Sequence, residues 1–107
     1  MGVRARDGKV HVGAARVDLR LQATHSLKDK RSILRRIAAA FDEMGCSVAE
    51  VGAQDQWQRA VLGIAVAAST PASVDRVLDR VVATVERDPR VTVIAVQELT
   101  DSIADGD

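Results

Sequence analysis

The middle of the chain, residues 51–63 (VGAQDQWQRAVLG), limits the possible folds more than any other stretch. Two apolar runs, at 46–51 and 57–68, meet there around a short polar turn, which is the pattern of a β-hairpin. The second run alternates strictly, with one apolar face formed by Ala60, Leu62, Ile64 and Val66. Because the turn is longer than the tight Asn-Gly type, the hairpin is predicted but its register stays open.

An amphipathic helix is predicted on each side of this hairpin. The first follows Ser26, a favoured N-cap with Asp29 placed to bond back to it, and ends at Gly45. The second starts at Ser69-Thr70-Pro71, a hydroxyl cap followed by a helix-starting proline, and ends before Pro89. The apolar stripes repeat at three- and four-residue spacing. They are Leu27, Ile33, Leu34, Ile37, Ala38, Phe41 and Met44, then Val74, Val77, Leu78, Val81, Val82 and Val85.

Strands are predicted at both ends of the domain. Residues 10–21 alternate between apolar and polar side chains, and residues 91–99 form a second apolar run. The order strand, helix, strand, strand, helix, strand predicts the α/β ferredoxin-like βαββαβ fold. We expect a four-stranded antiparallel sheet in the order 4-1-3-2, with both helices on one face. The domain is expected at 10–99, between a flexible basic extension at 1–9 and a disordered acidic tail at 100–107.

The sheet face without helices is predicted to be charged at one end and apolar at the other. Its charged side chains would form an ion-pair ladder of Arg16, Arg20 and Arg59 with Asp18 and Glu50. Its small apolar residues would be Val12, Ala14, Val61, Gly63 and Ala65. An open apolar face can pack against a second copy, which predicts a homodimer. Small side chains scattered between charges need no such explanation, and this alternative stays open.

Composition narrows the possible partners and compartment. The chain has 107 residues, of which 47% are hydrophobic, enough for one core without a metal or disulfide. Fifteen basic and fifteen acidic residues cancel, so any electrostatic attraction must be local. The lone Cys46 fits a reducing compartment. No run is apolar over the roughly 18 residues of a membrane span, and no secretory signal is recognisable. We expect a cytoplasmic protein with no membrane contact.

Basic residues gather at the start of the first helix, where positive charge opposes the helix dipole. They are Lys28, Lys30, Arg31, Arg35 and Arg36, with Asp29 among them. This cluster, together with His25 and the free amides of the helix start, predicts a polyanion-binding surface. We expect it to contact phosphates without sequence readout. A solvated helix face, whose long side chains shield apolar surface, is the alternative.

A second candidate site lies at the hairpin turn. The planar fork of Arg59 beside Trp57 could hold a phosphate or carboxylate, with Gln54 and Asp55 as further ligand or partner contacts. A structural ion pair and a buried strand-end tryptophan are the alternatives. The sequence lacks metal-ligand spacing, a Gly-rich phosphate loop and a nucleophile motif. It also lacks the first-strand aromatics of an RNA-recognition motif. We therefore expect no catalytic residues, metal or cofactor.

Three segments resemble the bacterial YlxP-like family, a domain family of unknown function. They are HSLKDKRSIL at 25–34, SVAEVGAQDQWQRAVLGIAV at 47–66 and VDRVLDRVVATVERDPRV at 74–91. The resemblance covers residues 10–99, implies a small ferredoxin-like domain and supplies no catalytic residues. Family members are often encoded beside translation-initiation and ribosome-maturation genes. The resemblance therefore favours a non-enzymatic binding domain for RNA or a ribosome-associated protein. A small-molecule or phosphate-ester site around Arg59 and Trp57 is the alternative.

Overall fold

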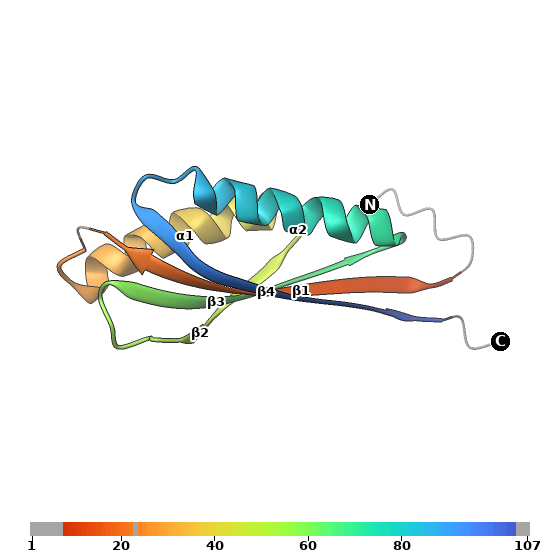
Figure 1. Ribbon diagram of the computed structural model, residues 1–107, viewed down its shortest axis with the longest axis horizontal. Coiled ribbons are helices and arrows are strands. Elements are labelled where there is room, and N and C mark those ends of the chain that lie inside the picture. Colours follow the sequence, from red (N-terminus) through yellow and green to blue (C-terminus); the bar gives the residue numbers. More distant parts are fainter. Residues whose placement is uncertain (1–7, 23, 105–107) are drawn as a thin grey trace.

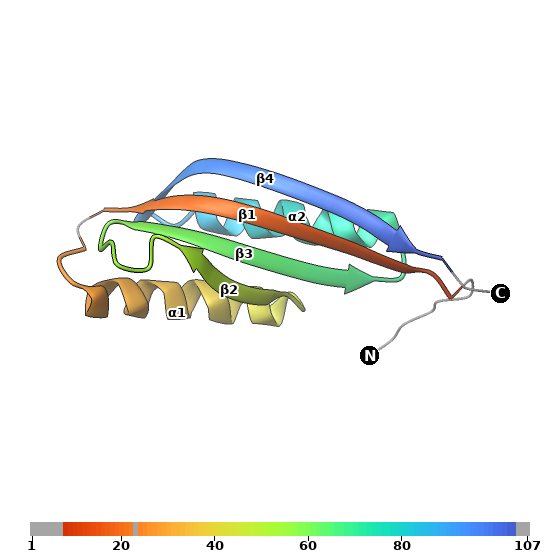
Figure 2. The same cartoon turned by 90° about the horizontal axis from the view of Figure 1, so that it is seen from below.

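The computed structural model describes residues 8–22 and 24–104. Its elements are β1 (Val10–Leu21), α1 (Leu27–Glu43), β2 (Ser47–Gly52), β3 (Arg59–Ala68), α2 (Pro71–Glu86) and β4 (Val91–Ile103). The strands form one antiparallel sheet in the order β2-β3-β1-β4, and both helices cover the same face (Figures 1 and 2). The predicted ferredoxin-like fold and its strand order are confirmed.

The helix ends follow the predicted capping chemistry. The Ser26 hydroxyl accepts a hydrogen bond from the Asp29 amide at 3.1 Å, and the Asp29 carboxylate accepts one from the His25 amide. The Thr70 hydroxyl caps α2 in the same way, and α2 begins at Pro71. After α1, Gly45 takes a φ of 82°, the left-handed conformation that glycine tolerates best. These local signals set where each helix begins and ends.

The core lies between the sheet and the two helices. It combines alternate side chains of β1 and β3 with one stripe of each helix, and Leu19, Leu21 and Phe41 have no exposed surface. The layers meet closely at Gly13, where an added Cβ would lie 2.5 Å from Cγ1 of Val74. The helix α2 can therefore rest directly on β1 because residue 13 has no side chain.

The last strand is longer than the sequence pattern predicted. β4 continues to Ile103, which pairs with Val10, so the expectation of a disordered tail is wrong for residues 100–103. The physical reason is that β1 starts at Val10 and offers backbone hydrogen-bonding groups along this edge. The two strands run on together past the start of α2 (Figures 1 and 2). Of the expected extension at 1–9, residues 1–7 lie outside the described residues, as do the last residues, 105–107.

Glu50 lies on the other side of the sheet from the one expected. It pairs with Leu62, a core residue, and so its side chain belongs to the helix-covered face. The expectation that Glu50 joins the ion-pair ladder of the open face is therefore wrong. Alternation assigns a carboxylate to the solvent side, but here a cation from α1 compensates for its partial burial.

Within the described residues, no helix is long and apolar enough to cross a membrane.

Candidate functional site

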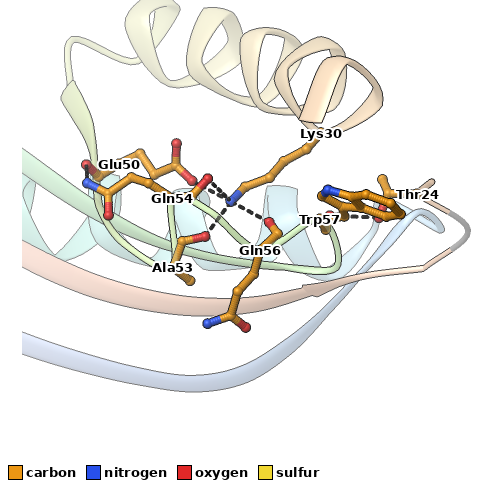
Figure 3. Close-up of polar contacts among 7 residues, drawn as sticks. All are labelled: Thr24, Lys30, Glu50, Ala53, Gln54, Gln56 and Trp57. Carbon is orange, nitrogen blue, oxygen red and sulfur yellow. Dashed lines mark hydrogen bonds and ion pairs between the residues drawn. The ribbon is translucent and has the colours of Figure 1, made fainter. Parts of the chain in front are cut away.

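Lys30 belongs to α1 but points inward, and only 2% of its side chain is exposed. In the helix it occupies the gap in the apolar stripe, three residues after Leu27 and three before Ile33. From there its ammonium reaches the turn of the hairpin (Figure 3). Nζ lies 2.7 Å from the carbonyl oxygen of Ala53, 2.8 Å from that of Gln56 and 3.5 Å from that of Gln54.

The same ammonium forms an ion pair with Glu50, whose Oε2 lies 2.7 Å away. That oxygen makes no well-aligned hydrogen bond within the described residues. A buried ammonium needs such a set of oxygen partners. The expectation that Lys30 belongs to an exposed polyanion-binding surface is therefore wrong.

The loop of residues 53–58 is held along its backbone. Besides the two short bonds from Lys30, the Thr24 hydroxyl donates to the carbonyl oxygen of Trp57 at 2.8 Å. The Leu21 amide donates to the carbonyl oxygen of Gln58 at 2.9 Å. Ala53 has a φ of 60°, which is uncommon for a residue with a side chain and persists where the surroundings hold it. The loop therefore has one defined backbone conformation.

This held loop carries exposed side chains. Gln54, Asp55 and Trp57 all face solvent, and 51% of the Trp57 surface is exposed. The alternative that Trp57 is a buried strand-end core residue is therefore wrong. Its carbonyl accepts the hydrogen bond from Thr24, while the indole lies at the end of the molecule where α1 begins (Figure 3).

The basic cluster of α1 is divided by the helix geometry. Lys28, Arg31 and Arg35 are exposed and spaced i, i+3 and i+7, so they form one line on the helix surface, which we call the basic stripe. None of the three forms an ion pair within the part of the chain that the structure describes. The exposed His25 lies just before this line begins.

Arg36 is exposed on a different side of α1, near Asp88. Hydrogen bonds from Arg90 hold the pKa of Asp88 below its ordinary value, and the charge of Arg36 makes a smaller contribution. The structure therefore keeps three of the five predicted cations together, buries Lys30 and separates Arg36.

Arg59 is held by a buried carboxylate on the open face of the sheet. Its Nε lies 3.1 Å from Oδ1 of Asp18 and its Nη2 lies 2.7 Å from Oδ2, while Asp18 is 5% exposed. The hydrogen bonds from Arg59 are the main cause of the lowered pKa of Asp18; burial opposes them, and the charges of Arg59 and Arg16 add to them. The expected ion-pair ladder is thus reduced to one bidentate pair.

Beside this pair the surface is hollowed. An open hollow of about 540 Å³ is lined by Arg20, Gln56, Gln58, Arg59 and Ile94, and we call it the arginine hollow. Arg20 lies directly opposite Arg59 in the β1–β3 register. Trp57 is not part of its lining, so the expected shared site of Trp57 and Arg59 is divided. Of the lining residues, sequence reasoning assigned only Arg59 to a ligand site, because grouping it with the others requires the strand register.

Across residues 8–22 and 24–104, no group of three or more His, Cys, Asp or Glu side chains is placed to hold a metal ion. Cys46 is buried, and burial raises the pKa of its thiol. A raised pKa lowers the thiolate fraction, which is the reactive form.

Comparison with known proteins gives the fold and the family. Residues 12–98 match the family model described as "Protein of unknown function (DUF503)". "Uncharacterized protein YlxP" of Bacillus subtilis (strain 168) is 33% identical over 81 residues, covering 75% of this chain and 88% of the relative.

Two solved structures are similar in fold. The de novo designed protein Foldit4 has a TM-score of 0.54 at 12% identity, covering 86% of this chain and 96% of its own. LarC2, the C-terminal domain of a cyclometallase involved in the synthesis of the NPN cofactor of lactate racemase, has a TM-score of 0.50 at 14% identity. That match covers 90% of this chain and 58% of LarC2. At these identities the likeness concerns the fold alone. By its family match and its similarity to YlxP, the chain belongs to the DUF503 family of proteins of unknown function.

Proposed function

We propose that this protein is a non-enzymatic domain that binds structured RNA through the basic stripe of α1. One observation carries the proposal: Lys28, Arg31 and Arg35 line one exposed face, and none has a carboxylate partner in the described residues. The other helix differs. On α2, Arg76 and Arg80 alternate with Asp75 and Asp79, so charges of both signs share its exposed surface.

The stripe is unfavourable in the free protein. Like charges three and four residues apart on a helix repel each other, and a cation in the first turn opposes the helix dipole. Phosphate groups spaced along an RNA strand would remove this repulsion and release counterions on binding. Contacts of that kind position a backbone and carry no base readout. The lone cysteine of the chain supports a reducing, cytoplasmic location for this function.

A direct titration tests the proposal. A labelled, structured ribosomal RNA fragment is titrated with the wild type, with Lys28→Ala/Arg31→Ala/Arg35→Ala, and with Arg76→Ala/Arg80→Ala/Arg87→Ala. The control removes the same number of exposed positive charges from α2 and the residue after it. We expect the stripe variant to lose at least about tenfold in affinity and the control to lose much less.

Two results would contradict the proposal. Equal weakening of both variants would show that net charge, and not the stripe, controls binding. Absence of binding by the wild type at low salt would remove RNA as the ligand. Capture of a partner from cell extract that survives nuclease treatment would point instead to a ribosome-associated protein.

We also infer that the apolar end of the open sheet face packs against a second copy. Leu99 and Ile103 are 68% and 67% exposed, and their strand partners Ala14 and Val10 continue the same surface. An open hollow of about 600 Å³ lies here. The arginines occupy the opposite end of this face, so two copies related by a two-fold axis across the strands could join their apolar ends without opposing their cations.

A further inference from the structure

We propose that the arginine hollow is a second ligand site, which binds one phosphate group. The hollow lies on the open face of the sheet, whereas α1, the helix that carries the basic stripe, covers the other face (Figure 2). The inference therefore goes beyond the proposed function and does not depend on it. Three features of the hollow support it: its uncompensated charge, the fixed position of Arg59 and of the loop backbone, and an irregularity in the neighbouring strand.

The charge at this end of the sheet is unbalanced. Arg20 and Arg59 lie directly opposite each other on β1 and β3, and like charges in such positions destabilise a sheet. Asp18 pairs with Arg59, but Arg20 forms no ion pair within the described residues. A bound anion would supply the missing negative charge.

Arg59 and the backbone of the two glutamines are held before any ligand arrives. Asp18 fixes the Nε and Nη2 edge of Arg59, which orients the rest of the guanidinium. Gln56 and Gln58 belong to the 53–58 loop, whose carbonyls are bound by Lys30 and by the Leu21 amide. Side chains on a held backbone lose less freedom when they bind a ligand. The buried Lys30 thus supports this site from the opposite side of the sheet.

The third feature is a bulge in β4. The β1–β4 pairing goes from Asp18–Ala95 to Leu19–Val93, so Ile94 has no partner. Ile94 is the residue of β4 that lines the hollow, and its side chain is 49% exposed. Bulges of this kind often redirect a side chain next to a binding site.

Together these side chains match the chemistry of a phosphate ester. Guanidinium groups and amide N–H groups donate charge-assisted hydrogen bonds to phosphate oxygens. Ile94 offers an apolar surface to the rest of the ligand. A free nucleotide and a phosphodiester of an RNA strand carry this same group, and the experiment must separate these two sources.

Thermal unfolding and isothermal titration test the site with inorganic phosphate, adenosine 5′-monophosphate and adenosine as probes. The variant is Arg20→Gln, because Arg59→Gln would leave the buried Asp18 without its partner. The matched control is Arg16→Gln, on the same strand and face but outside the lining. We expect phosphate or the monophosphate to raise the Tm of the wild type, because a ligand stabilises the state that it binds. Arg20→Gln should weaken that binding at least about tenfold, with Arg16→Gln close to wild type and adenosine inactive.

The structured RNA fragment supplies the other arm. If the free probes do not bind, but Arg20→Gln weakens RNA binding more than Arg16→Gln does, the phosphate is one of an RNA strand and the site stands. Equal effects of the two substitutions on every probe would overturn the inference, as would no effect of either on any probe. The basic-stripe variant keeps the hollow intact, so loss of RNA binding in that variant alone supports the proposed function. In that case the second site is contradicted only if the free probes also fail to bind.

Discussion

Lys30 joins two distant parts of the chain through a single side chain. It belongs to the segment HSLKDKR, and its oxygen partners belong to the segment SVAEVGAQDQWQR. They lie in two of the three segments that carry the resemblance to the YlxP-like family. The structure gives a physical reason why the two segments occur together. Each segment supplies the hydrogen-bonding partner for a polar group that the other segment buries. An ammonium under a helix needs oxygen partners, and loop carbonyls turned inward need a donor.

Replacing Lys30 should therefore be costly. Lys30→Met fills the same space but leaves the carbonyls of Ala53 and Gln56 without their donor and Glu50 without its counter-charge. We expect a loss of about 2–4 kcal/mol in the free energy of unfolding, measured by chemical denaturation. Lys28→Met, an exposed position on the same helix, should change it by no more than about 0.5 kcal/mol.

A double variant separates the contribution of the ion pair from that of the carbonyl contacts. Lys30→Met/Glu50→Met removes both charges, so it should be more stable than Lys30→Met alone, although the loop carbonyls still lack their donor. If the two variants are equally unstable, the ion pair contributes nothing and the carbonyl contacts explain the whole effect. A Lys30→Met protein as stable as wild type would contradict the buried role of this residue.

Asp18 should make the free energy of unfolding depend on pH in the acidic range. Its pKa in the folded protein is lowered, so between its unfolded value of about 3.9 and its folded value the unfolded chain binds more protons. The contribution of the pair is therefore present above this window and is lost as the pH falls through the folded pKa. Denaturation midpoints measured from neutral to acidic pH should fall less steeply for Asp18→Asn. An identical acid dependence in both proteins would rule out this contribution.

At the scale of the elements, local sequence patterns predicted the helices and their ends, but they did not predict the contacts between strands. The stripe of α1 predicted its buried face, and the position of Lys30 in that stripe was a usable signal for its burial. The hydroxyl caps and Gly45 likewise predicted the helix ends. The face of Glu50 and the lining of the arginine hollow depend on strand register and bulges. No local pattern in one strand determines which residue of another strand it will face.

The contact between α2 and β1 gives an element-scale prediction. Gly13→Ala would place a Cβ against Val74, so we expect the two elements to separate and the free energy of unfolding to fall by about 1–3 kcal/mol. Gly63→Ala is the control, because its Cβ would meet the exposed side chain of Val51 at 3.1 Å, where movement is easier. Thermal denaturation of both variants measures the difference. Equal stability of the two would mean that α2 does not rest on β1 in this way.

At the scale of the whole molecule, the two faces of the sheet differ in what covers them and in composition. The helix-covered face holds the core and Lys30, while the open face has cations at one end and apolar side chains at the other.

Light scattering during size-exclusion chromatography tests the proposed packing of a second copy. We expect the wild type to show twice the chain mass and Leu99→Lys to show a single chain mass. Because Leu99 is exposed in one copy, the substitution should leave the unfolding temperature of the monomer nearly unchanged. A monomeric wild type throughout a dilution series would contradict the dimer.

The salt dependence of RNA binding tests the proposed function most directly. The slope of the logarithm of the affinity against the logarithm of the salt concentration reports how many phosphates the protein neutralises. We expect the wild-type slope to be steeper by about 2–3 than the slope of the stripe variant, Lys28→Ala/Arg31→Ala/Arg35→Ala. The slope of the control variant, Arg76→Ala/Arg80→Ala/Arg87→Ala, should stay near that of the wild type. Equal slopes for the wild type and the stripe variant would show that the basic stripe of α1 does not contact RNA.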